Sequence, residues 1–211
     1  MSVLAAEAEF EQAWADPRAT RAEFPPVDVN QVLAERYVTS EPVHFTRAML
    51  WDLETRKAAA PGVFIPYVVR SGSDASWAPG RPGGALGDEF VRSSDQRLWA
   101  EPEVYGLVLE EVYLDQEQQT VTFLGRAEFP DADGAPLHAD PRQPLFHVQH
   151  GVAGGEQQPL NTWRIVLLTE QPDAALVARF TEQGRDPWLP GFVENYIREV
   201  LGVELERKDL G

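Results

Sequence analysis

Residues 104 to 129, VYGLVLEEVYLDQEQQTVTFLGRAEF, decide the fold prediction. Two runs rich in Val, Leu, Tyr, Phe and Thr flank the polar residues 115 to 118, a pattern typical of two antiparallel strands joined by a short turn. A turn centred on Gln116 and Glu117 would pair Val112 with Val121. The sequence therefore predicts a long β-hairpin at the centre of a sheet. The helices before and after the hairpin are expected to cover that sheet.

The two faces of this hairpin follow from the alternation of side chains along a strand. One face is apolar except for Glu110, and it carries Val104, Val108, Val112, Val121, Phe123, Ala127 and Phe129. The other face is half apolar, with Tyr105, Leu107, Leu109, Tyr113 and Leu124 among Thr120, Thr122, Arg126 and Glu128. This is more apolar surface than a solvated face needs, so we expect a helix, another subunit or a ligand to cover it.

Composition narrows the class of protein. The chain has 211 residues, of which 43% are hydrophobic, so a packed core is feasible. The formal net charge is -16, and the basic residues are scattered singly or in pairs. Polyanions would be repelled by such a surface, which disfavours nucleic acid and anionic membranes as partners. No apolar run approaches the roughly 18 residues of a membrane helix.

The chain contains no cysteine. Disulfides, thiolate nucleophiles, cysteine-based zinc sites and iron–sulfur clusters are thereby excluded. The first residues, MSVLAAEAEFEQAW, lack the basic region of a secretory signal and become acidic by Glu7. We therefore expect a cytoplasmic protein.

Helix signals recur before the hairpin. They predict helices over residues 2 to 15, 29 to 37 and 41 to 60, with Ser2, Asp28 and Ser40 as N-caps. The spacing of Phe45, Met49 and Leu53 indicates that the third helix faces the core. Prolines break the chain around the second helix, and residues 1 to 40 are predicted to form a helical arm beside a single α+β domain of residues 41 to 211.

Further strands are predicted over residues 63 to 70, 88 to 94, 145 to 152 and 161 to 169, and helices over 172 to 183 and 191 to 201. This order implies an antiparallel sheet of about six strands covered by N-terminal and C-terminal helices, an α+β fold. From about residue 41 onward, the order of elements resembles helix-grip ligand-binding domains of START-like shape. The resemblance rests on that order and on no sequence motif.

Residues 71 to 87, SGSDASWAPGRPGGALG, form a long loop rich in Gly and Pro. Loops of this length without their own secondary structure are often functional lids. Trp77 would then fold over an apolar site. The alternative is a tethered loop that buries one tryptophan on the body of the protein.

His147 and His150 are the histidine pair nearest to metal-ligand spacing. On a strand, an odd spacing places them on opposite faces, so we expect no metal site there. Alternation places Glu110 on the core face, where it would need a cation such as Arg92, Arg126 or Arg164. We favour the alternative that a local bulge turns Glu110 to solvent. An inward Glu–Arg pair in a pocket would be a candidate site.

The sequence leaves three functions open. The first is a non-catalytic domain that binds a small, largely apolar molecule between the curved sheet and the C-terminal helix, without a cofactor. The second is a homodimeric interaction protein, and the third is an enzyme that uses Glu110 with an Arg and a His in the same pocket. The candidate ligand-binding residues are Trp77, Arg92, Glu110, Arg126, His147 and Arg164.

Overall fold

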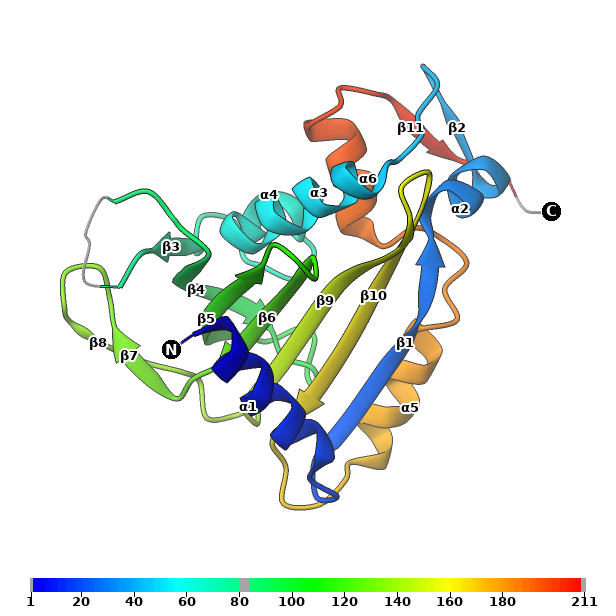
Figure 1. Cartoon of the computed structure of the whole chain (residues 1–211). Coiled ribbons are helices and arrows are strands. Elements are labelled where there is room, and N and C mark those ends of the chain that lie inside the picture. The colour runs from blue at the N-terminus through cyan, green and yellow to red at the C-terminus, as the bar shows by residue number, and fades with distance from the viewer. Residues whose placement is uncertain (1, 80–83, 210–211) are drawn as a thin grey trace.

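The computed structural model describes residues 2–79 and 84–209. Within them, seven strands form one antiparallel sheet in the order β1-β10-β9-β6-β5-β4-β3 (Figure 1). These strands are β1 (Thr20–Asp28), β3 (Ala75–Trp77), β4 (Glu89–Arg97), β5 (Tyr105–Asp115), β6 (Thr120–Gly125), β9 (Phe146–Gly155) and β10 (Gln158–Leu167). Two smaller sheets pair β2 (Tyr37–Thr39) with β11 (Leu205–Arg207), and β7 (Glu128–Pro130) with β8 (Pro136–His138).

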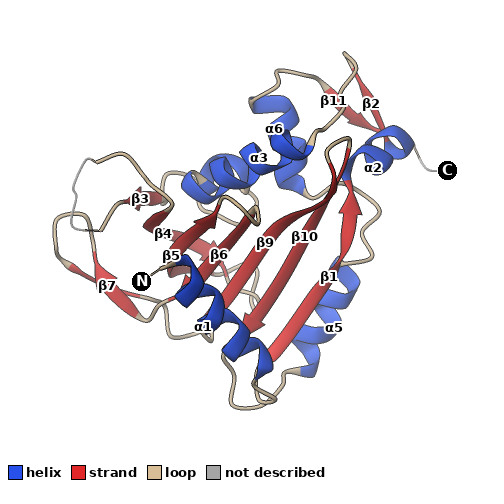
Figure 2. Ribbon diagram, viewed as in Figure 1, coloured by secondary structure: helices blue, strands red, loops and turns tan. Residues whose placement is uncertain are grey.

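Helices lie on both faces of the large sheet, as Figure 2 shows. They are α1 (Val3–Ala15), α2 (Val29–Arg36), α3 (Arg47–Ala59), α4 (Pro61–Phe64), α5 (Ala174–Gln183) and α6 (Gly191–Glu199). The inner face packs on α3 and α5 and carries Val112, Val121, Phe123, Val148 and Ile165. The predicted α+β architecture, an antiparallel sheet covered by N-terminal and C-terminal helices, is confirmed.

The outer face of the sheet, defined by Tyr113, Leu124 and Val166, is covered by α1. This helix begins after Ser2, whose hydroxyl accepts a hydrogen bond from the backbone N–H of Ala5. Its buried side, with Phe10 fully enclosed, packs on the three sheet residues. The predicted cover of the half-apolar face is therefore a helix of the same chain.

The hairpin is present, but its register differs from the prediction by two residues. Val112 pairs with Phe123, and the turn lies between Asp115 and Thr120. The Asp115 carboxylate accepts hydrogen bonds from two backbone N–H groups of the turn, and Gln119 adopts a left-handed φ of 53°. Both features stabilise the turn. A shift of two residues preserves the faces, so the predicted division holds within β5 and β6. It is wrong for Ala127 and Phe129, which follow the end of β6, and Phe129 lies in β7 of a separate small sheet.

Helix α3 begins at Arg47 rather than at Glu41. The side chain of Asn30 holds the backbone of Phe45 by accepting from its N–H at 2.7 Å and donating to its carbonyl at 2.8 Å. Because these backbone groups are bonded to Asn30, the helix starts later, with Thr46 as its N-cap. Phe45 and Leu53 are fully buried, as the predicted core-facing stripe requires.

Two other sequence interpretations are wrong. Residues 20 to 28, expected in a helical arm, form the edge strand β1, which pairs with β10 along its length. Pro25 and Pro26 sit at an irregularity of that strand, and an edge tolerates residues without an N–H. Residues 63 to 70, expected as a strand, contain the end of α4 and a turn, and only Val69 makes an isolated bridge.

Replacing Phe10 by Ala should destabilise the protein by about 3 to 5 kcal/mol, because the change leaves a cavity between α1 and the outer face. Urea denaturation measures this free energy. Leu4→Ala is the control on the same helix, since Leu4 is 76% exposed and its removal should change little. Equal effects of the two substitutions would show that α1 does not pack on the sheet.

Candidate functional site

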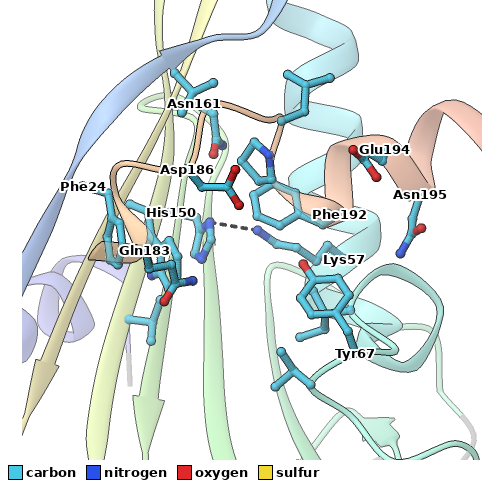
Figure 3. A pocket seen from close by; sticks show the side chains of 18 of the residues that line it. Phe24, Lys57, Tyr67, His150, Asn161, Gln183, Asp186, Phe192, Glu194 and Asn195 are labelled. Carbon is cyan, nitrogen blue, oxygen red and sulfur yellow. Dashed lines mark hydrogen bonds between the residues drawn. The ribbon is translucent and has the colours of Figure 1, made fainter. Parts of the chain in front are cut away.

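A cavity of about 480 Å³ lies between the inner face of the sheet and the helices that cover it. Figure 3 shows side chains from the sheet on one side of the cavity and from α3, α6 and neighbouring loops on the other. This volume lies within the range of small-molecule sites in proteins. The cavity is therefore the candidate functional site.

The interruption between α5 and α6 helps to shape this cavity. Residues 184 to 190 leave the helical path, because Pro187 and Pro190 cannot continue a regular helix. The segment lines the cavity with Trp188 and Leu189. It is held by the backbone N–H of Leu189, which donates to the hydroxyl of Tyr37 at 3.0 Å.

Aromatic rings form much of the cavity wall. Trp163 stacks on Phe24 with ring centroids 4.0 Å apart, and on its other side it stacks on His150 at 5.4 Å. The edge of Phe192 contacts His150 from α6. Trp99, Phe123 and Phe146 add further apolar surface. Such walls favour a largely apolar, ring-containing molecule.

A buried polar cluster, Glu54, Lys57, His150 and Asn161, interrupts this apolar lining. Glu54 is completely buried on α3, and its Oε2 atom lies 2.5 Å from Nζ of Lys57. Its Oε1 atom accepts a hydrogen bond from Asn161 at 2.7 Å. Lys57 Nζ also lies 2.8 Å from Nδ1 of His150. Three members of this cluster, Lys57, His150 and Asn161, line the cavity.

Burial and neighbouring charges have opposite effects on the pKa values of Glu54 and Lys57. Burial by itself would raise the pKa of Glu54, but Lys57 and His150 outweigh it and hold that pKa at about 2. Burial lowers the pKa of Lys57 to about 8, although Glu54 favours the charged amine. Burial also lowers the pKa of His150. A neutral imidazole that accepts from Lys57 at Nδ1 carries its proton on Nε2.

Arg92 and Glu110 form a second buried pair in the cavity wall, with Nε and Oε2 2.7 Å apart. The guanidinium also donates to the carbonyl of Ala58 at 3.1 Å and lies over the ring of Phe123. It thus ties the end of α3 to the sheet. The interpretation that a bulge turns Glu110 to solvent is wrong, because this residue is 2% exposed and pairs directly with Arg92 across two strands.

The six residues proposed from sequence do not form one site. Arg92 and Glu110 meet in the cavity. Arg126, His147 and Arg164 lie on the outer face of the sheet, where Arg126 joins Glu9 of α1 to Glu111 of β5. Arg164 lies over the ring of Phe10. All three residues lie between α1 and the outer face, Arg126 and Arg164 as its ion-pair partners and His147 beside Glu9, so the structure separates them from the cavity.

Trp77 is buried in β3, where its ring meets the edge of Phe129 at 5.7 Å. This matches the tethered alternative. Among the described residues of the 71–87 loop, none lines the cavity, so a lid formed by this part of the loop is not supported. Residues 80 to 83 of the predicted lid lie outside the described residues.

The sequence interpretation did not propose three polar residues that line the cavity, Lys57, His150 and Asn161, nor their buried partner Glu54. Glu54 and Lys57 are three residues apart on a helix, beside the buried Leu50 and Leu53. That spacing was the available signal, since charged residues next to a core stripe are brought to the core together. The prediction that His147 and His150 face opposite ways is confirmed: His147 lies 3.7 Å from Glu9 of α1, and His150 faces Lys57.

The sequence matches no protein-family model. It also has no match among curated proteins. Similar folds are found among solved structures. The Zhui aromatase/cyclase from Streptomyces sp. R1128 aligns with 88% of this chain and 99% of its own, at 10% identity and a TM-score of 0.51.

Two further structures are similar over most of their length. A START superfamily protein from Mycobacterium smegmatis has 9% identity, covers 79% of this chain and 98% of its own, and gives a TM-score of 0.46. Ginseng major latex-like protein 151 from Panax ginseng has 11% identity, with 80% and 94% covered and a TM-score of 0.45. At these identities the likeness concerns the fold alone. The chain has a helix-grip, START-like fold.

In the part of the chain that the structure describes, no helix has both the length and the apolar character needed to cross a membrane. Among the same residues, no group of three or more His, Asp or Glu side chains is arranged to hold a metal ion.

Glu54→Gln should destabilise the protein by about 3 kcal/mol near pH 6, because it leaves Lys57 buried without its counter-charge. The pKa of Glu54 is lowered to about 2, so its contribution is present above the unfolded value of about 4.5 and is lost as pH falls toward 2. The difference in unfolding free energy between the wild type and the variant should therefore decrease as the pH is lowered. Urea denaturation between pH 3 and 6 measures it.

The matched control is Glu182→Gln, in an exposed pair with Arg185 at the same helical spacing. This change should have no measurable effect at any of these pH values. A gap for Glu54→Gln that stays constant or widens in acid would contradict the assignment of a buried, charged Glu54.

Proposed function

We propose that this chain is a non-catalytic binding domain for a small, largely apolar molecule that carries one carbonyl or hydroxyl group. The observation that supports this most strongly is the cavity of about 480 Å³, with aromatic walls and a buried polar cluster at one place. The aromatic rings would stack on the apolar body of the ligand. The polar cluster would hydrogen-bond to its carbonyl or hydroxyl group and so set its orientation.

Charge balance favours a neutral molecule over an ion. Lys57 is paired with Glu54, and Arg92 with Glu110, so each buried cation in the wall already has its counter-charge. A charged ligand would have to lose its hydration without gaining a free partner. A neutral oxygen needs only a hydrogen-bond donor. Nε2–H of His150 offers one, since no group of the described residues accepts a hydrogen bond from this atom.

An enzyme remains the second candidate, and one observation favours it. Arg92, Glu110 and His150 line the same cavity, which is the combination that an acid–base mechanism at this site would use. The likeness to an aromatase/cyclase supports the fold and carries no reaction to this chain. Binding is the function for which the geometry gives the fuller account.

The structure removes the reason for which a homodimer was predicted. It was expected because one face of the sheet is too apolar to stand in water, and α1 of the same chain covers that face. The cytoplasmic location and the exclusion of nucleic acid rest on composition and charge, and they stay predictions.

Binding can be tested with 3-phenylpropan-1-ol, which joins an aromatic ring to one hydroxyl. Titration should raise the melting temperature and quench tryptophan fluorescence saturably, since Trp99, Trp163 and Trp188 line the cavity. Val148→Phe, which places a ring in the cavity from β9, should weaken binding by about tenfold or more, or about 1.4 kcal/mol.

Val177→Phe is the matched control, because Val177 lies on α5 with 36% of its surface exposed. It should leave the binding constant unchanged. Binding that is equal in both variants, or absent in the wild type for this alcohol and for a panel of similar neutral molecules, would overturn the proposed function.

A further inference from the structure

The chain uses arginine for nearly all of its cations. Of 18 basic residues, only Lys57 and Lys208 are lysines, and Lys57 is the one in the cavity wall. The two side chains differ chemically at such a place. A guanidinium keeps its proton in proteins, whereas a buried amine can lose it and become a nucleophile. Arginine and lysine could both form an ion pair with Glu54. The ion pair alone therefore does not explain why this position holds a lysine.

The nitrogen of Lys57 is held in a defined position. Glu54 Oε2 lies 2.5 Å away on the same helix, and His150 Nδ1 lies 2.8 Å away on β9. The ring of Phe192 lies in a third direction, with its centroid 3.9 Å from Nζ. Figure 3 shows Lys57 reaching across the cavity toward His150, below Phe192. The amine therefore lies in the cavity wall, with Phe192 beside it.

The charged groups around this amine oppose one another. Glu54 on α3 favours the ammonium, whereas Arg92 on β4 disfavours it, and Arg92 is itself paired with Glu110 on β5. His150 on β9 supplies a neutral nitrogen, and Asp186 and Glu194 also line the cavity. With a pKa lowered to about 8, about a tenth of Lys57 is neutral at pH 7.

A neutral Lys57 would have a usable geometry. Its two N–H bonds can donate to Glu54 and His150, which leaves the lone pair pointing in the third direction. A ring face repels a lone pair, so Phe192 has to turn aside for a ligand to approach. Phe192 is the second residue of α6, next to the segment 184 to 190 that lines the cavity.

We propose that Lys57 captures the carbonyl group of an aldehyde or ketone in this cavity as an imine. This inference rests on the proposed function, because the molecule must first bind between the sheet and α6. It assigns the ligand class, a largely apolar carbonyl compound, and it assigns Lys57 as the nucleophile.

The reaction balances with water as its only by-product. The ammonium first releases one proton to solvent, and the lone pair of the neutral Nζ then forms a bond to the carbonyl carbon while the π electrons of the carbonyl move to oxygen. The oxygen takes a proton from solvent and becomes a hydroxyl, and the positively charged nitrogen gives one proton to Nδ1 of His150. His150 passes that proton to the hydroxyl, which leaves as water while the C–N double bond forms, so the product is a protonated imine. The apolar wall around the product limits the access of water that would reverse the reaction.

The test uses the full chain, 3-phenylpropanal and sodium cyanoborohydride, which reduces an imine to a stable secondary amine. Peptide mass mapping should find the mass of the aldehyde less one oxygen on Lys57. The rate at Lys57 should exceed that at Lys208 by at least tenfold and should rise between pH 6 and 8. An excess of 3-phenylpropan-1-ol, which occupies the cavity and forms no imine, should suppress the reaction at Lys57 alone.

Variants separate capture from binding. Lys57→Arg keeps a cation beside Glu54 and should abolish the adduct at this position, whereas Lys208→Arg should leave the capture rate unchanged. His150→Gln, which removes the proton acceptor beside Nζ, should slow capture and flatten its pH profile. Because Lys208→Arg and the competition arm leave the cavity intact, the test does not depend on whether Lys57→Arg folds.

The outcomes of this test are distinct. If the aldehyde stabilises the protein and the alcohol displaces it, but Lys57 stays unmodified, imine capture is overturned and binding stands. Equal modification of Lys57 and Lys208, or modification that the alcohol does not suppress, also overturns capture. If neither compound stabilises the protein and Lys57 is unmodified, the proposed function fails together with the capture.

Discussion

The structure depends on a seven-stranded sheet that is apolar on both faces, each of which must be kept from water. The two faces are closed differently. On the outer face a single helix, α1, lies directly on Tyr113 and Leu124, and ion pairs from Arg126 to Glu9 and Glu111 fasten it. On the inner face α3 and α5 pack on the sheet, and the segment between α5 and α6 leaves the helical path. The cavity follows from this second arrangement.

Burying the polar cluster in the inner face costs free energy that other interactions must offset. A buried carboxylate and a buried amine each lose hydration, and their mutual attraction offsets this only when the remaining atoms are also satisfied. Glu54 meets the condition in part: Oε1 accepts a hydrogen bond from Asn161, whereas Oε2 has the ion pair with Lys57 but no hydrogen-bond partner among the described residues. A pair of apolar residues would pack here as well or better. The position of the cluster at a cavity, rather than in solid core, gives it a use as a ligand-orienting site.

Sequence patterns predicted much of the fold, because local signals and long-range packing agree for the hairpin, for α1 and for the last two helices. They failed where a distant residue decides the outcome. Asn30 delays the start of α3 by binding the backbone of Phe45, and pairing with β10 makes a strand of a proline-containing segment. For the site, alternation along β5 placed Glu110 inward, and Arg92 was among its expected partners. Lys57 and Glu54 were missed because only the tertiary fold brings α3 onto His150 and Asn161.

The central claim is that the inner face holds a ligand cavity and the outer face is closed by the chain itself. The indole N–H signals of the six tryptophans, followed by NMR during titration with 3-phenylpropan-1-ol, test it most directly. The account predicts that the signals of Trp99, Trp163 and Trp188 shift, because these residues line the cavity. The signals of Trp14 on α1 and Trp77 in β3 should stay in place. Shifts confined to Trp14 and Trp77, or equal shifts of all six, would contradict it.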